Sequence, residues 1–103
     1  MFVAAWSLDV QFASAAEALR AIKEFAAQDL KLWRTKGSRI LLGAIGVPES
    51  RIVVEYEFET LADLEATWNA LHARGPEIFR AWLERMQPHV VAGSPRWEVY
   101  RVV

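Results

Sequence analysis

The first quarter of the chain changes from a period of two to a helical period. In residues 2–10 the even positions are apolar, whereas the later odd positions are polar, which predicts a half-buried strand. Residues 14–28 then show the spacing of an amphipathic helix. This segment opens with Ser14 and Glu17, which have the spacing of a capping box, so we expect each side chain to satisfy a backbone N–H of the first turn.

The middle of the chain predicts a hairpin followed by a helix. Residues 39–47 form an apolar run rich in branched side chains, and residues 51–59 alternate apolar even positions with acidic odd positions. The period changes from two to about 3.6 at Thr60. The Thr60 hydroxyl can cap a helix that runs to about Ala73. We therefore expect two strands joined by a turn, and then a helix.

The last third of the chain predicts a second helix and a final strand. Gly75 ends the preceding helix, Pro76 suits a first helical position, and the apolar stripe that follows stops at Pro88. Residues 96–103 are aromatic and β-branched, which is typical of a strand. The order is β-α-β-β-α-β with a broken second helix. It predicts an α+β, ferredoxin-like fold, in which a four-stranded antiparallel sheet has neighbouring first and third strands and one helix-covered face.

Composition indicates a single soluble domain, residues 1–103, that forms a homodimer. Apolar residues make up 53% of the 103 residues and charged residues 24%, which is more apolar material than a small monomer easily buries. The formal charge of −1 gives no field that would attract nucleic acid or an anionic membrane. The N-terminal segment has neither a basic leader nor a membrane span. The chain has no cysteine, which is compatible with the expected cytoplasmic location.

One face of the predicted sheet is left without helices. It would carry the odd residues of the first and third strands, including Ser7, and would be small and polar at its centre. Such a face suits either solvent or the wall of a cavity shared with a second subunit. The carboxylates of Asp9, Glu55 and Glu57 lie on it and are candidate general bases. The alternative is that arginines of the outer strands neutralise them.

His72 is the first candidate for proton transfer, because histidine exchanges protons readily near neutral pH. It follows Trp68 by four residues, on the same helical face, just before the break at Gly75. The alternative is a helix-terminal histidine that only interacts with the helix dipole. His89 follows Pro88 in a loop and is expected at the surface. Neither histidine belongs to a recognisable ligand pair, so we expect no metal.

Tryptophan is frequent, with five residues in the chain. They are Trp6, Trp33, Trp68, Trp82 and Trp97. Indole side chains can line a pocket for a flat apolar ligand, so all of them except Trp33 are candidate ligand-binding residues, together with Ser7 of the open face. The alternative is that they fill the core and a dimer interface. The sequence has no phosphate-binding loop or nucleotide fingerprint, and we expect no cofactor.

The stretch FETLADLEATWNAL, followed by a break and PEIFRAWLERM, resembles the dimeric α+β barrel superfamily, and within it the NIPSNAP-like proteins. The resemblance covers residues 40–103 by motif and the rest by element order. It implies a homodimer with the two sheets face to face. The superfamily includes antibiotic-biosynthesis monooxygenases, haem-degrading enzymes, polyketide cyclases and members with no assigned activity, so its functions diverge widely.

The resemblance carries over to only a few site residues. His72 resembles in position the catalytic histidine of plant polyketide cyclases, once a one-residue gap is allowed. Haem-degrading members also place a tryptophan at the position of Trp68. However, this chain has Trp82 at the position where they carry the histidine that binds the haem. Two classes of function follow. One is a cofactor-independent monooxygenase-like or cyclase-like enzyme acting on an apolar or aromatic small molecule. The other is a non-catalytic NIPSNAP-like binding or assembly protein.

Overall fold

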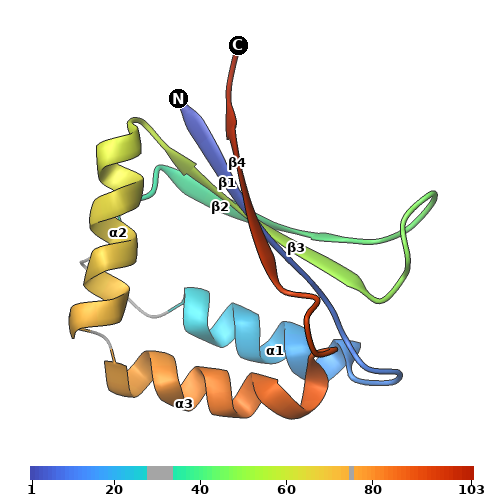
Figure 1. Cartoon of the computed structure of the whole chain (residues 1–103). Coiled ribbons are helices and arrows are strands. Elements are labelled where there is room, and N and C mark those ends of the chain that lie inside the picture. The colour runs from blue at the N-terminus through green and yellow to red at the C-terminus, as the bar shows by residue number, and fades with distance from the viewer. Residues whose placement is uncertain (28–33, 75) are drawn as a thin grey trace.

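The predicted order of strands and helices is present in the structure of the chain, a computed structural model that describes residues 1–27, 34–74 and 76–103 (Figure 1). Its elements are β1 (Phe2–Asp9), α1 (Ala15–Ala26), β2 (Gly37–Leu42), β3 (Arg51–Phe58), α2 (Leu61–Arg74), α3 (Pro76–Met86), the 3₁₀ helix η1 (Gln87–His89) and β4 (Arg96–Arg101). The strands form a four-stranded antiparallel sheet in the order β2-β3-β1-β4. The predicted α+β ferredoxin-like fold, with β1 beside β3, is confirmed.

The alternation of apolar and polar residues along β1 and β3 decides which side chains enter the core. Leu8 pairs with Ile52 across these strands, and both side chains are almost fully buried on the face that looks toward the helices. Burying a side chain of this size contributes roughly 1.5–3 kcal/mol. All three α-helices lie on this side of the sheet (Figure 1). The opposite face, which carries the odd residues, has no helix over it in the described chain, as the sequence predicted.

β2 is shorter than predicted. The apolar run 39–47 was expected to be strand throughout, but β2 ends at Leu42 and residues 43–50 form a loop that extends beyond the sheet (Figure 1). Pro48 passes close to Gly43, where an added Cβ would lie 1.8 Å from the backbone oxygen of Pro48. Ile45 is 97% exposed, so its apolar side chain does not belong to a buried strand. The strand prediction for residues 43–47 is therefore wrong.

The capping box predicted at the start of α1 is also wrong. Ser14 has φ −95° and ψ −5°, and its side chain makes no capping hydrogen bond. Its Oγ lies 3.0 Å from Nδ1 of His89 instead, while Glu17 forms an ion pair with Arg20 at 2.8 Å. Both side chains of the expected box thus have other partners. His89 is half-buried by this contact, so it is less exposed than expected.

The two long helices of the second half begin where the sequence predicted. Thr60 precedes α2, and its Oγ1 accepts a hydrogen bond from the backbone N–H of Asp63 at 3.1 Å, which is the expected cap. α3 begins at Pro76 and lies along α1. The predicted break at Gly75 lies outside the described residues, as does Trp33. In the described part of the chain, no helix combines the length and apolar character that crossing a membrane requires.

Candidate functional site

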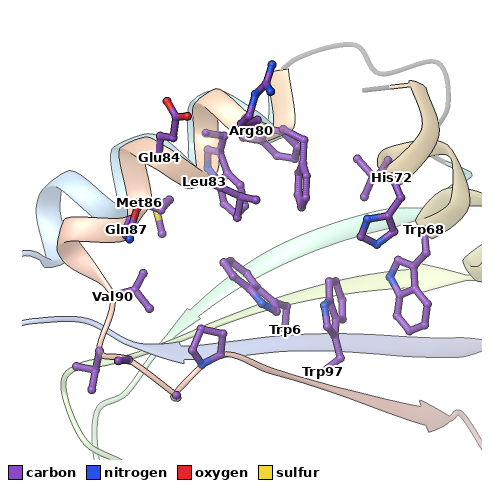
Figure 2. Close-up of a pocket in the computed structure, with 18 of the residues that line it drawn as sticks. Trp6, Trp68, His72, Arg80, Leu83, Glu84, Met86, Gln87, Val90 and Trp97 are labelled. Carbon is purple, nitrogen blue, oxygen red and sulfur yellow. The ribbon is translucent and has the colours of Figure 1, made fainter. Parts of the chain in front are cut away.

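A cavity of about 680 Å³ lies between the helix-covered face of the sheet and the helices (Figure 2). Its volume falls in the range of small-molecule sites, and its lining is mainly apolar. The aromatic lining residues are Trp6, Phe25, Tyr56, Trp68, Phe79, Trp82 and Trp97. A pocket with this lining suits a flat, apolar molecule.

The four predicted tryptophans of the described chain come together in this pocket. Trp6 and Trp97 are partners in the register of β1 and β4, and their ring centroids are 6.4 Å apart. Trp82 reaches Trp6 from α3 at 5.4 Å, and Trp68 reaches Trp97 from α2 at the same distance. The Nε1 of Trp82 donates a hydrogen bond to the backbone oxygen of Ala21 at 3.2 Å, which fixes its ring. The rings form a continuous aromatic wall.

His72 lies at the rim of the same pocket. It follows Trp68 by one helical turn, as the spacing predicted, and Figure 2 shows its side chain reaching from α2 into the space beside Trp68. Its ring stands edge-on to Phe79, with the centroids 6.1 Å apart and the planes at 84°. His72 is exposed, so its side chain borders both the solvent and the space of the pocket. The position fits an acid–base residue.

The remaining polar side chains of the pocket are mostly at its outer edge. Arg80 and Glu84 of α3 point away from the cavity, and Gln87 follows at the start of η1 (Figure 2). Tyr56 is different, because it is a buried residue of β3 on the sheet side. Sequence reasoning counted Tyr56 only as an apolar strand residue. The sequence feature that could have identified it is a side chain with a hydroxyl group at a position where the apolar–polar alternation of the strand predicts burial.

The predicted carboxylates lie on the other face of the sheet. Asp9 forms an ion pair with Arg51 at 3.0 Å, and Glu55 forms one with Arg39. The hydrogen bond that Arg51 donates to the Asp9 carboxylate raises the pKa of the Arg51 guanidinium. The site residues predicted for this face are Ser7, Asp9, Glu55 and Glu57. Because the sheet separates them from His72, they belong to a different surface of the subunit and are not part of the aromatic pocket.

The loop before β4 forms one wall of the pocket and is held by Ser94. Its Oγ accepts a hydrogen bond from the backbone N–H of Asp9 at 3.0 Å and donates one to the backbone oxygen of Val91 at 2.7 Å. The N–H of Val91 in turn donates to the oxygen of Asp9 at 2.8 Å. Gly93, with φ +80°, allows the turn between them. Nothing in the sequence pattern marked this serine.

No metal-ligand cluster accompanies the pocket. Within residues 1–27, 34–74 and 76–103, no three histidine or carboxylate side chains converge as metal ligands would. That the protein works without a metal or another cofactor stays a prediction.

Comparisons with known proteins find structural relatives. No family model matches the chain, and no curated protein matches it. A NIPSNAP domain protein from Burkholderia xenovorans matches with a TM-score of 0.78 and 13% identity, covering 100% of this chain and 95% of that chain. A protein provisionally described as an antibiotic biosynthesis monooxygenase, from Caulobacter crescentus, matches with a TM-score of 0.65 and 25% identity, covering 99% and 89%. A second protein so described, from Nitrosomonas europaea, has a TM-score of 0.72 and 16% identity, covering 100% and 99%.

These matches confirm the predicted resemblance at the level of the fold. The chain shares its fold with NIPSNAP-family structures and with structures provisionally described as antibiotic biosynthesis monooxygenases. Proteins of one fold carry out different functions, so the reaction has to be inferred from the pocket itself.

Proposed function

We propose that the protein binds an apolar or aromatic small molecule in the pocket between its sheet and its helices, and transforms it without a metal or an added cofactor. The observation that carries this proposal is the cavity of about 680 Å³, lined by four tryptophans and bordered by His72. The enzyme class would be that of a cofactor-independent monooxygenase or of a cyclase or isomerase.

Binding would come mainly from the aromatic wall. Each buried ring that stacks against a flat ligand contributes about 0.5–1.5 kcal/mol beyond the apolar area that it removes from water. The tryptophans are already held against one another and against Ala21, so little side-chain freedom is lost on binding. This arrangement favours rigid, planar molecules over flexible chains.

The proposed chemistry is proton transfer by His72. A neutral imidazole can take a proton from a hydroxyl or an activated C–H group of the ligand, which leaves an electron-rich anion in an apolar pocket. Such an anion can be oxidised by molecular oxygen, so that an activated CH2 group and O2 become a carbonyl group and water. It can instead attack a carbonyl carbon of the same ligand and close a ring, and the resulting alkoxide takes the proton back. The exposed position of His72 lets the proton pass on to water.

A second candidate function is a non-catalytic NIPSNAP-like binding or assembly protein. Two observations favour it. NIPSNAP-family structures have the same fold, with a TM-score of 0.78 for one from Burkholderia xenovorans. In addition, His72 stands at the rim and not deep in the cavity, whereas catalytic acid–base groups often act in sites that exclude water. The two candidates differ in one outcome, which is whether a bound ligand is converted.

We also propose that the subunit pairs with a second copy through the open face of its sheet. The centre of this face consists of the small side chains of Ala5 and Ser7, and the partly exposed Leu41 and Tyr100 lie on its outer strands. Three of its arginines form ion pairs with carboxylates of the same chain, Arg39 with Glu55, Arg51 with Asp9 and Arg96 with Glu98, which lowers the cost of covering them. Sedimentation at micromolar concentration tests the pairing, and a strictly monomeric species contradicts it.

Ligand binding can be tested by quenching of tryptophan fluorescence with a series of three-ring aromatic ketones and phenols, followed by product analysis. The matched variants are Leu83→Arg, which places a charge in the pocket lining, and Leu61→Arg, a similarly exposed leucine outside it. Leu83→Arg should weaken binding at least tenfold, while Leu61→Arg should leave it unchanged. Equal effects of the two variants, or no quenching by any ligand, would count against the pocket as the site.

A further inference from the structure

A second, smaller cavity lies next to the aromatic pocket, in the groove where α1 and α3 run side by side (Figure 1). Its volume is about 270 Å³, which is just below the range of small-molecule sites, so the groove is too small to act as a site alone. Its lining includes Glu24 of α1 and Ile78, Ala81 and Arg85 of α3, which are all exposed. The groove therefore opens to the solvent.

Among the residues that the structure describes, two line both the pocket and the groove. They are Phe25 of α1 and Trp82 of α3. Their rings stack on each other, with the centroids 4.8 Å apart and the planes at 29°. Phe25 is buried and Trp82 is half-buried. Because each ring borders both spaces, the stacked pair separates the pocket from the groove.

Trp82 is held in this position by several contacts. Its Nε1 donates a hydrogen bond at 3.2 Å to the backbone oxygen of Ala21, a residue of α1 that also lines the groove. Its ring lies 5.4 Å from the ring of Trp6, and Phe79 stacks against it at 5.9 Å. A side chain that is held both by its polar atom and by its ring has little freedom left to lose when a ligand binds. The indole of Trp82 is therefore a fixed wall of the pocket.

We propose that Trp82 is a specificity-determining residue, whose indole sets the length of the ligand that the pocket accepts. This inference rests on the proposed binding function. The indole closes the pocket on the side of the groove, so a rigid molecule bound in the pocket ends there. Without the indole, the pocket and the groove would join into a longer cavity between α1 and α3. A longer aromatic molecule could then bury one more ring.

The test compares 9-fluorenone with 2-phenyl-9-fluorenone, which has the same three-ring frame and one more ring at its end. Equilibrium dialysis gives both affinities without using the fluorescence of the tryptophans that are replaced. The longer molecule should bind to the wild-type protein no more tightly than the shorter one. Trp82→Ala should bind the longer molecule at least about tenfold more tightly than the shorter one, because the burial of one aromatic ring contributes on the order of this factor.

Two further positions provide the controls. Ala81 lines the groove but not the pocket, so Ala81→Trp alone should change neither affinity. Combined with Trp82→Ala, the same substitution fills the groove and should remove the preference for the longer molecule. Trp97 lines the pocket but not the groove. Trp97→Ala should therefore weaken the binding of both molecules alike and leave the ratio of their affinities unchanged.

Several outcomes would overturn the inference. A tenfold preference for the longer molecule in the wild-type protein means that Trp82 does not limit ligand length. Equal affinities in folded Trp82→Ala, or a preference that persists after Ala81→Trp is added, mean that the groove does not take the extra ring. If Trp82→Ala does not fold, Trp82→Phe, which keeps a ring against Phe25, should shift the ratio in the same direction, and an unchanged ratio overturns the inference. Failure of both molecules to bind to the wild-type protein contradicts the proposed function itself.

Discussion

The two faces of the sheet are made from the same strands and differ in every property that matters for function. On the helix-covered face, β1 and β4 present Trp6 and Trp97 to a cavity. The residues next to them, Ser7 and Arg96, stand opposite each other on the open face, where charged side chains pair with one another. We therefore place the proposed chemistry on the first face and the proposed subunit contact on the second.

The sharpest way to break this comparison is to remove His72. A positioned acid or base contributes about 10² to 10⁴ in rate, so His72→Ala should lower turnover by a factor of this size. Stability should change little, because a helix-terminal histidine contributes only about 0.3–1 kcal/mol through the dipole. Steady-state kinetics and urea unfolding measure the two effects.

The outcome for His72 also decides between the two faces. His89→Ala serves as a control, because His89 contacts Ser14 and does not line the pocket. If His72→Ala loses stability but keeps its activity per folded molecule, His72 is structural. The search for the base should then move to the open face, to the carboxylates of Asp9, Glu55 and Glu57.

Truncating the core side of β1 tests the energetic difference between the faces. Leu8 is 1% exposed beneath the helices, and Leu8→Ala should lower the free energy of unfolding by about 2–5 kcal/mol. Its neighbour Ser7 points to the open face, and Ser7→Ala should change the same quantity by less than about 0.5 kcal/mol. Chemical denaturation of both variants gives the comparison, which would fail if the two costs were similar.

The pocket wall should depend on Ser94. Ser94→Ala removes the acceptor of the Asp9 N–H and the bond to Val91, and should cost about 1–3 kcal/mol of stability. Hydrogen exchange at the amides of these two residues should become faster, and ligand affinity should fall. Ser38→Ala is the control, because Ser38 is an exposed residue of β2. Unchanged exchange in Ser94→Ala would show that the wall is held by other contacts.

The smallest effect is expected on the open face. Glu55 pairs with Arg39, whose side chain is largely exposed, so Glu55→Gln should cost less than about 1 kcal/mol, and less still at high salt. Ligand affinity should stay the same because the sheet lies between Glu55 and the pocket. Unfolding at low and high ionic strength, together with fluorescence titration, measures this. A loss of turnover comparable to that of His72→Ala would reverse the assignment of the two faces.

The sequence predicted the fold well because its signals were local and consistent. The alternation in β1 and β3, the cap at Thr60 and the proline at the start of α3 each act within a few residues. The prediction failed at Gly43, where the loop back to Pro48 replaces the strand, and at Ser14, whose side chain has a distant partner. The contact between Ser14 and His89 joins residues 75 positions apart, so no local sequence pattern can predict it.

The sequence predicted which types of residue form the site, but not how they are arranged. The tryptophans and His72 could be selected by residue type and helical spacing, but their meeting depends on register and on how α3 lies over the sheet. Tyr56 was missed because the alternation of β3 marks a buried position but does not show that this position lines the pocket. The sequence therefore selected suitable side chains, and the packing decided which of them share a cavity.

Asp9 belongs to both faces at once. Its backbone N–H and oxygen form hydrogen bonds with Ser94 and Val91 in the wall of the pocket, while its carboxylate forms an ion pair with Arg51 on the open face. A molecule that binds to the open face and displaces Arg51 would therefore act on Asp9, the residue that also anchors the wall of the pocket. Asp9 thus connects the open face of the sheet with the wall of the pocket through a single residue.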